Sequence, residues 1–491
     1  MRKLIWALGA AALVSAQLIT GGADAAARRP LVIGMALEPP HLDPTAGAAA
    51  AIDEVVYANV FEGLTRLDQN GAVQPQLATD WTVSDDGLTY TFNLKPGVKF
   101  HDGTDFDAED VVFSLNRART SPENAQPQLF SAIDTVEAID PLTVRITLSR
   151  PEGSLTFNLG WGDAVIVAPE SADTDKTNPI GTGPFKFSRW VRGDRVELVP
   201  ADDRAMLGKV TFKFISEPSA QIAALLAGDV DAFPNLNARE AVPQFQADPR
   251  FEVVVGTTEG ETLLSTNNGH APFNDIRVRQ AIAHAIDRNE LIQGSEFGFG
   301  TPIGSHFAPH NPAYVDLTNT YPLDLDAARK LLTEAGYPDG FKATIKLPPP
   351  AYARRGGEII AAQLKRIGID LEIIPVEWAQ WLDQVFRGDD YDLTIVSHTE
   401  PLDIGIYARD KYYFNYHSDE FNKIIADLDK TSDPAGRAAL YGEAQKVLAR
   451  DAVNGFLFQL AKIGVWNKDV KGLWHNSPIQ ANDVTGVSWA N

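Results

Sequence analysis

Apolar and polar residues alternate along several short stretches in the first half of this chain. The stretches cover residues 88–94, 142–148 and 210–214, and in each of them every second side chain is apolar. A period of two residues is typical of half-buried β-strands, and the turn Asp86-Gly87 stands directly before the first stretch. The first part of the chain is therefore predicted to be rich in strands.

Beyond residue 270 the apolar positions recur at helical spacing instead. Four helices are predicted there: residues 276–286 after the N-cap Asp275, 325–335 after Asp324, 356–367 before Gly368, and a helix from Pro434 after Asp433. A strand is predicted over residues 369–374, directly after the third helix. The order helix, glycine, strand indicates an α/β unit with a partly parallel sheet, so the predicted fold class is α/β.

The N-terminal segment has the pattern of a secretory signal peptide. Arg2 and Lys3 precede an apolar run to about Ile19, and small residues in an Ala-x-Ala arrangement follow up to Ala27. The run is shorter than the ~20 apolar residues that a spanning helix needs. We expect residues 1–27 to be removed on export. The chain has no cysteine, so we expect a periplasmic protein without a lipid anchor or disulfides.

Composition and charge narrow the function classes. The chain is 44% hydrophobic and 22% charged, as globular proteins are, and its length suffices for two or three domains. The formal net charge of −22 argues against binding to nucleic acid or to an anionic membrane, because both need clustered bases. The sequence lacks a Gly-x-Ser-x-Gly elbow, a His-Glu-x-x-His motif and a phosphate loop. An enzyme is therefore not expected, and a hydrolase is only a remote alternative.

One long stretch of motifs separates this chain from α/β proteins in general. Residues 77–114 contain LATDW, DGLTYTFNLKPGVKFHDG and FDAEDVVFS in this order. Further blocks are PIGTGPF at 179–185, LAGDVD at 226–231, FNDIRVRQAI at 273–282 and QLKRIGI at 363–369. Together they resemble the bacterial extracellular solute-binding proteins of family 5, which include dipeptide-, oligopeptide-, glutathione- and nickel-binding components of ABC importers.

The resemblance implies a three-domain periplasmic binding protein fold, with two hinged α/β lobes and a strand-rich insertion domain. Domain I would comprise residues 28–52, 166–257 and 469–491, domain II residues 53–165 and domain III residues 258–468. A ligand would bind in the cleft between domains I and III, and an ABC permease of the inner membrane, with its ATPase subunits, would receive it. We expect a monomer that uses no cofactor.

The resemblance also implies a place for a ligand amine. Peptide binders of this family carry an acidic segment in domain III, whose first aspartate holds the α-ammonium of the peptide. The corresponding segment here is Ser397–Asp403, with Glu400 in the place of that aspartate and His398 replacing part of the usual aromatic start. Because the segment follows a predicted strand at 391–396, its acids should face a crevice and bind an ammonium by charge-assisted hydrogen bonds. Local turn capping is the alternative role for Asp403.

Three aromatic residues are further candidates for ligand contacts. His41 lies in the proline-rich loop after the first predicted strand, where a rigid surface loop is the alternative role. Trp378 and Trp381 follow the strand at 369–374, in a region that supplies aromatic cleft walls in the relatives. An indole face would suit a cation or an apolar side chain of the ligand, and the alternative for either tryptophan is a place in the core.

Asn267, Asn268 and Arg409 complete the candidate site. The two asparagines are expected at the hinge between domains I and III, where they would bond the ligand backbone. Arg409 lies just beyond the acidic segment and would bind a ligand carboxylate through two hydrogen bonds, or else pair with Asp403 or Asp410.

The predicted ligand is a small peptide or another amine-bearing solute. The alternatives are an opine, an oligosaccharide or a metal complex. His306 and His310 are four residues apart, but Pro309 between them disrupts a helical presentation of both rings. No metal-binding residue is therefore predicted from the sequence.

Overall fold

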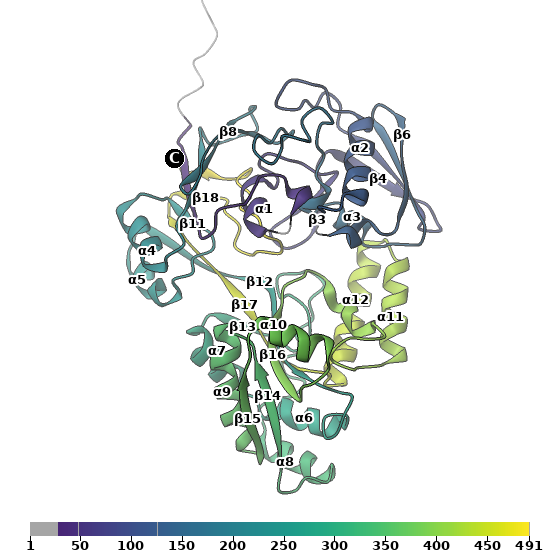
Figure 1. The fold of residues 1–491 in the computed structure, drawn as a ribbon, viewed down its shortest axis with the longest axis vertical. Coiled ribbons are helices and arrows are strands. Elements are labelled where there is room, and N and C mark those ends of the chain that lie inside the picture. The colour runs from purple at the N-terminus through teal and green to yellow at the C-terminus, as the bar shows by residue number, and fades with distance from the viewer. Residues whose placement is uncertain (1–27, 48, 125, 491) are drawn as a thin grey trace, which may run out of the picture.

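The computed structural model describes residues 28–490 except residues 48 and 125. The predicted signal peptide, residues 1–27, lies outside the described residues. Figure 1 shows an upper and a lower body joined by two long strands, β12 (Phe251–Thr266) and β17 (Gly455–Asn467). In the part of the chain that the structure describes, no helix has the length and apolar character needed to cross a membrane.

One sheet runs through both bodies. Its strand order is β15-β14-β16-β12-β17-β11-β1-β10-β9-β8, and β13 pairs with β17. The bounds of these strands are β1 Leu31–Met35, β8 Phe185–Val191, β9 Arg195–Pro200, β10 Val210–Phe214, β11 Ala232–Phe233, β13 Gly300–Pro302, β14 Phe341–Leu347, β15 Ile369–Pro375 and β16 Leu393–His398. Strand β1 is parallel to β10, and β14 is parallel to β15 and to β16, which confirms the predicted α/β class.

The antiparallel pair β12 and β17 carries the sheet from one body to the other. The first half of β12, up to Thr257, pairs with β17 from Ala461 onward, and after an irregularity Glu261 pairs with Gln459. Residues 258–260 thus interrupt the ladder where the two bodies meet. A β-bulge bends a strand and increases its local twist, so the strand direction is expected to change at this junction.

The domain boundaries remain a prediction, and the crossing strands bear on two of them. The expected boundary at 257/258 falls on the irregularity of β12. The return crossing of β17 lies near Gln459–Ala461 and not at residue 468. The strand continues unbroken into the upper body, so its last residues belong to the upper part of the sheet.

A second sheet lies in the segment predicted as the insertion. Its four antiparallel strands are, in spatial order, β4 Ala78–Val83, β5 Thr89–Leu94, β7 Thr143–Leu148 and β6 Ile133–Asp140. The alternation predicted for β5 is confirmed, since Tyr90, Phe92 and Leu94 are buried. They share a core with helix α2 (Ala108–Thr120), which begins after Asp107 in a capping box. The insertion therefore has a hydrophobic core of its own.

The remaining elements of the upper body are short. They are β2 Thr65–Leu67, β3 Val73–Pro75, α1 Ala50–Val56, α3 Leu155–Asn158, α4 Pro218–Ala227, α5 Val242–Ala247, β18 Val470–Lys471, β19 Ser488–Trp489 and the 3₁₀ turns Pro44–Ala46, Pro127–Phe130, Gly162–Ala164 and Arg239–Ala241. Strand β18 pairs with β19, so the C-terminal segment returns to the upper body.

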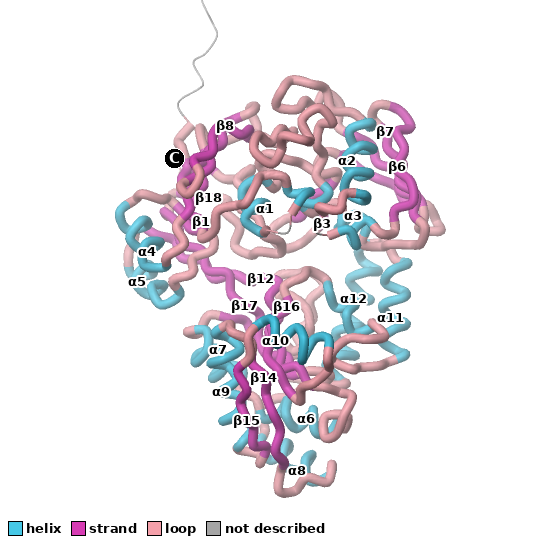
Figure 2. Tube along the Cα trace, viewed as in Figure 1, coloured by secondary structure: helices cyan, strands magenta, loops and turns pink. Residues whose placement is uncertain are grey.

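Helices cover the sheet of the lower body, as Figure 2 shows. They are α6 Ile276–Ala285, α7 Arg288–Glu296, α8 Leu325–Glu334, α9 Ala351–Lys365, α10 Trp378–Trp381, α11 Asp419–Lys430 and α12 Pro434–Arg450, with a π turn at Leu382–Arg387 and a 3₁₀ turn at Asp403–Ala408. The predicted N-caps Asp275, Asp324 and Asp433 are confirmed, because each side chain accepts a hydrogen bond from a backbone N–H of the first turn. Helix α9 begins five residues before the predicted start, directly after Pro350.

Candidate ligand-binding pocket

A pocket of about 540 Å³ lies where the two bodies meet. Its upper wall comes from the end of β1, helix α1, the loops after β10 and β11, and residues 477–482. Its lower wall comes from residues 258–260 of β12, from Thr399 after β16, and from residues 460–461 of β17. The crossing strands themselves supply most of the lower wall, so a change in the angle between the bodies would alter the width of the pocket.

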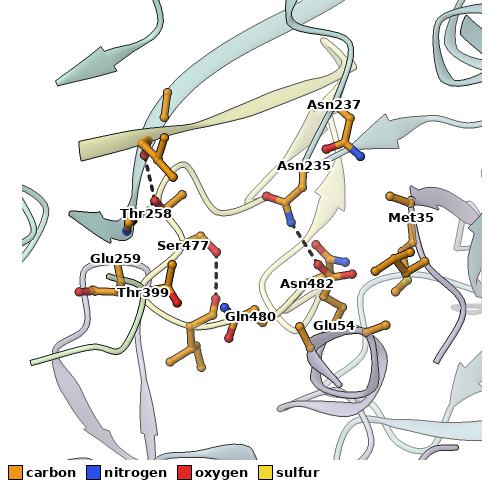
Figure 3. A pocket seen from close by; sticks show the side chains of 18 of the residues that line it. Met35, Glu54, Asn235, Asn237, Thr258, Glu259, Thr399, Ser477, Gln480 and Asn482 are labelled. Atoms are coloured by element: carbon orange, nitrogen blue, oxygen red, sulfur yellow. Dashed lines mark hydrogen bonds between the residues drawn. The ribbon is translucent and has the colours of Figure 1, made fainter. Parts of the chain in front are cut away.

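Polar side chains reach into the pocket from both walls. Figure 3 shows Glu54, Asn235 and Asn482 on one side, and Thr258 and Glu259 on the other. Among the described residues that line the pocket none is aromatic. Carboxylate, amide and hydroxyl groups therefore dominate its polar chemistry, and stacking on an aromatic ring is not available in this arrangement of the bodies.

Glu54 of helix α1 is the acid of the upper wall. The Nδ2 atom of Asn235 donates a long hydrogen bond of 3.5 Å to Glu54 Oε1. Burial raises the pKa of Glu54 to about 7, and the charge of Lys462 opposes that rise. Burial likewise lowers the pKa of Lys462 to about 7, and its Nζ donates to the carbonyl oxygen of Trp474 at 2.7 Å. Glu54 is therefore expected to gain or lose its proton near neutral pH.

Glu259 in the interruption of β12 is the acid of the lower wall. Its Oε1 lies 2.7 Å from His310 Nε2, and His310 Nδ1 lies 2.7 Å from Thr257 Oγ1. Burial raises the pKa of Glu259, and the hydrogen bond and charge of His310 oppose that effect. The pocket therefore has one carboxylate on each body, half-buried in Glu54 and buried in Glu259.

Arg239 adds a base to the upper wall, but its charge is already paired. Its guanidinium forms an ion pair with the buried Glu296 of helix α7. Burial lowers the pKa of Arg239. The pair joins the upper body to the lower one, so Arg239 acts as a link between the walls and is less available to a ligand carboxylate.

Comparison with known proteins assigns the family. The model of the bacterial extracellular solute-binding proteins, family 5 Middle, matches residues 72–418, which is most of the chain. The chain belongs to family 5 of the bacterial extracellular solute-binding proteins. Members of this family serve ABC importers, and the chain is accordingly a solute-binding component of such an importer. The resemblance expected from the motifs is confirmed.

Curated relatives of this family 5 protein differ in what their names say they bind. The glutathione-binding protein GsiB of Salmonella paratyphi A is 28% identical over 506 residues, covering 96% of this chain and 96% of its own length. Heme-binding protein A of Haemophilus influenzae is 28% identical over 429 residues, covering 77% of this chain and 78% of its own. The similarity to GsiB covers nearly the whole chain and so extends well beyond the segment that the family model matches.

Solved structures confirm the expected periplasmic binding protein fold. HbpA2 from Haemophilus parasuis superposes with a TM-score of 0.87 at 25% identity, covering 94% of this chain and 100% of that one. The periplasmic binding protein DppA from Helicobacter pylori, in complex with the peptide STSA, gives a TM-score of 0.72 at 28% identity and covers 94% and 98%. The path of the chain through both bodies is therefore that of family 5.

The acidic segment expected from the family is divided in the structure. Thr399 lines the pocket, and Glu400 directly after it is exposed but does not line the pocket. Asp403 turns away from the pocket, toward His306 and His398. A role for Glu400 at a ligand amine remains a prediction, whereas Asp403 and His398 form a separate buried cluster.

The expected aromatic and cationic contacts lie beside the pocket and not in it. Trp381 is buried, and its Nε1 donates to Thr394 Oγ1 at 2.9 Å, as a core tryptophan does. Trp378 is 40% exposed and stands edge-on to Trp381, with ring centroids 5.7 Å apart. Arg409 is exposed and stacks over the ring of Tyr412. None of these candidates is among the pocket-lining residues.

The two expected asparagines lie well beyond the junction between the two bodies. Asn267 and Asn268 follow the end of β12, and the sixteen-residue strand has crossed the junction at 258–260 well before it reaches them. At about 3.3 Å per residue they are roughly 25 Å beyond the junction, and their expected role at the hinge remains a prediction. Both amides donate to backbone carbonyls of the lower body, among them that of Tyr391.

His41 is half-buried and also stands outside the pocket lining. Burial lowers the pKa of His41, and the charge of Asp43 opposes that effect. Its neighbour in the loop, Leu37, does line the pocket and is 65% exposed. The proline-rich loop thus reaches the pocket, although through another residue than the one expected.

Sequence reasoning missed the polar groups that line the pocket. They come from segments distant in the chain: Glu54, Asn235, Asn237, Glu259, Ser477, Gln480 and Asn482. The only local signal is the run of polar residues 257–262 within β12, which includes Glu259. The others needed the fold to bring them together.

Proposed function

We propose that this protein captures a small peptide or another amine-bearing solute in the pocket between the two bodies. The observation that carries the proposal is the pair of carboxylates on facing walls, Glu54 above and Glu259 below. A ligand ammonium placed between them makes charge-assisted hydrogen bonds to both bodies. It therefore favours the closed arrangement over the open one, and only such differential contacts can drive closure.

The other lining groups suit a peptide backbone. Asn235, Asn237, Gln480 and Asn482 offer amide donors and acceptors, and Thr258 adds a hydroxyl. A pocket of 540 Å³ is in the range of small-molecule sites. The relative named as a glutathione-binding protein and the neighbour solved with the peptide STSA support this class of ligand. Glu400, next to Thr399, is proposed as a further contact in the closed form.

The remaining parts of the proposal concern the export of the protein and its role in transport. The chain would lose residues 1–27, act as a monomer in the periplasm without a lipid anchor, and perform no reaction on its ligand. The closed, loaded form would dock on its inner-membrane permease, and hydrolysis of ATP would occur on other subunits.

A thermal-shift screen of the exported protein, freed of carried-over ligand, tests this function. It pairs short peptides with their N-acetylated forms and includes opines, oligosaccharides and a nickel complex. A ligand at ~100 times its dissociation constant stabilises the folded state by about 2.7 kcal/mol, which is a visible rise in melting temperature. Free peptides should raise it, and acetylated ones should not.

Three variants locate the contact. Glu54→Gln and Glu259→Gln should abolish the preference for the free amine, whereas Glu358→Gln, an exposed acid on α9, should behave as the wild type. Equal shifts by free and acetylated peptides would contradict the amine contact. A shift produced only by a sugar or an opine would leave the importer assignment intact and replace the ligand class.

A further inference from the structure

Two histidines and an aspartate form a compact group behind the lower wall of the pocket. His306 comes from the loop after β13, His398 from the end of β16, and Asp403 from the start of the 3₁₀ turn that follows. Each residue offers one potential ligand atom, a ring nitrogen or a carboxylate oxygen, and these three atoms lie within 4.8 Å of one another. His306 Nε2 is 2.6 Å from Asp403 Oδ1, and His398 Nδ1 is 3.4 Å from Asp403 Oδ2.

Both imidazole rings are held from behind by tyrosine hydroxyls. His306 Nδ1 lies 3.1 Å from Tyr407 Oη, and His398 Nε2 lies 3.0 Å from Tyr413 Oη. The Nδ2 of Asn454 in turn donates to Tyr407 Oη at 3.0 Å. One nitrogen of each ring is thereby fixed, and the other points to the aspartate. Metal-binding histidines are oriented in this way, through a hydrogen bond of the second nitrogen.

A second carboxylate beside the group has an oxygen without a partner. Glu261 is 2% exposed and pairs with His398 across β12 and β16, and it shares a narrow internal cavity with His306 and Asp403. Its Oε2 has no hydrogen-bond partner among the described residues. Burial raises the pKa of Glu261 well above its ordinary value, and the charges of Glu259 and Asp403 add to that effect. Burying a carboxyl oxygen without a hydrogen-bond partner costs free energy, and a cation bound to that oxygen would remove the cost.

We propose that His306, His398 and Asp403 bind a divalent transition-metal ion such as Zn²⁺, and that a side-chain movement brings Glu261 in as the fourth ligand. Imidazole and carboxylate are ligands of Zn²⁺ and of its neighbours in the first transition row, whereas Ca²⁺ and Mg²⁺ prefer oxygen alone. In a tetrahedral site with bonds of about 2.1 Å the ligand atoms stand roughly 3.4 Å apart. The 2.6 and 3.4 Å separations reach this geometry by small side-chain movements.

Metal binding at this group releases protons. The short contact between His306 Nε2 and Asp403 Oδ1 requires a proton between the two atoms, and the ion takes the place of that proton. Asp403 faces both imidazoles through its two oxygens, so its carboxylate is placed to bind a cation. Glu261 must be ionised to bind the ion. The affinity should therefore fall as the pH falls.

The ion would stiffen the lower wall of the solute pocket. Glu259 lines both the pocket and the narrow cavity, and Thr399 of the pocket directly follows His398. A bound ion ties the segment 399–403 to β12 and to the loop that carries His306. The site is thus distinct from the solute pocket, and the ion is a resident part of the protein and not its cargo.

Calorimetric titration of Zn²⁺ into the full exported chain, after treatment with a chelator and dialysis, tests the proposal. One ion per chain is expected. His306→Asn and Asp403→Asn should each weaken binding by at least about a hundredfold, and Tyr407→Phe, which keeps the ring and removes the hydroxyl that orients His306, by about tenfold. His417→Gln, at an exposed histidine, and Glu54→Gln, in the solute pocket, should bind Zn²⁺ like the wild type.

X-ray absorption at the zinc edge of the wild-type protein tests the ligand set without relying on variants that must fold. Two imidazole nitrogens and carboxylate oxygens should surround the ion. Failure of the metal-free wild type to take up Zn²⁺, wild-type affinity in both His306→Asn and Asp403→Asn, or a spectrum without two imidazoles would each overturn the proposal. Because Glu54→Gln impairs only solute binding, failure here is separable from failure of the proposed function.

Discussion

The guanidinium Nη2 of Arg117 lies 2.7 Å from the carboxylate Oδ2 of Asp43. Asp43 is fully buried in the loop after β1, and it also accepts hydrogen bonds from the backbone N–H and the hydroxyl of Thr45. Arg117 belongs to α2, which packs on the second sheet. One ion pair therefore fastens the insertion to the part of the upper body from which the pocket is built.

Breaking this pair should destabilise the whole upper body. We expect Asp43→Asn to lower the free energy of unfolding by about 3 kcal/mol, because it leaves a largely buried guanidinium without its partner. Urea denaturation at pH 7 measures the change. Asp427→Asn, which removes the exposed i,i+4 partner of Lys423 on α11, is the matched control and should leave the midpoint unchanged. Equal midpoints for both variants would contradict the prediction.

Close packing leaves no room for a side chain at Gly181, which belongs to one of the family motifs. A Cβ atom there would lie 2.0 Å from the backbone oxygen of Val60, which cannot move away as a side chain could. Gly181→Ala should therefore cost about 1–3 kcal/mol of stability, measured as a fall in the denaturation midpoint. Gly486→Ala is the control, since a Cβ atom at Gly486 meets no atom within 4 Å. A wild-type midpoint for Gly181→Ala would show that the loop can shift.

Binding of an amine-bearing solute should depend on pH through Glu54. Burial raises the pKa of Glu54 to about 7 although Lys462 opposes the shift, so the carboxyl is largely protonated and uncharged below that pH. An ammonium needs the ionised form. The affinity should rise between about pH 5.5 and 7.5, where a peptide amine stays mostly charged.

Calorimetry across that pH range checks the dependence on Glu54. Glu54→Gln should weaken binding at pH 7.5 by about 10- to 100-fold, the value of a hydrogen bond to a charged group, and should flatten the part of the pH dependence that Glu54 causes. Glu358→Gln serves again as the exposed control. An unchanged pH profile in Glu54→Gln would assign the dependence to another group, with Glu259 as the first to test.

The capping box of α2 offers a local test of the insertion. The side chain of Asp107 accepts from the backbone N–H of Glu109, and Asp110 accepts from the backbone N–H of Asp107. Asp107→Ala should lower stability by about 1 kcal/mol, whereas Asp107→Ser, which keeps an accepting oxygen, should lose much less. Thermal unfolding followed by circular dichroism distinguishes the two. Equal losses would mean that the side-chain oxygen is not the stabilising group.

The sequence by itself determined the local elements and the family. The N-caps Asp275, Asp324 and Asp433 were predictable because a cap depends only on hydrogen bonds within one helical turn. The alternation of residues 88–94 was predictable because a strand exposes one face and buries the other. The start of α9 was missed, since Pro350 sets it and the apolar stripe begins only later.

The tertiary structure alone decided which polar residues meet. Glu54, Asn235, Glu259 and Asn482 line one pocket although hundreds of residues separate the first from the last. In the sequence, His306 and His310 were considered together as metal ligands. In the structure, His306 contacts Asp403 and His310 contacts Glu259. Neighbours along the chain carry no information about such pairs, because the path of β12 and β17 through both bodies brings them together.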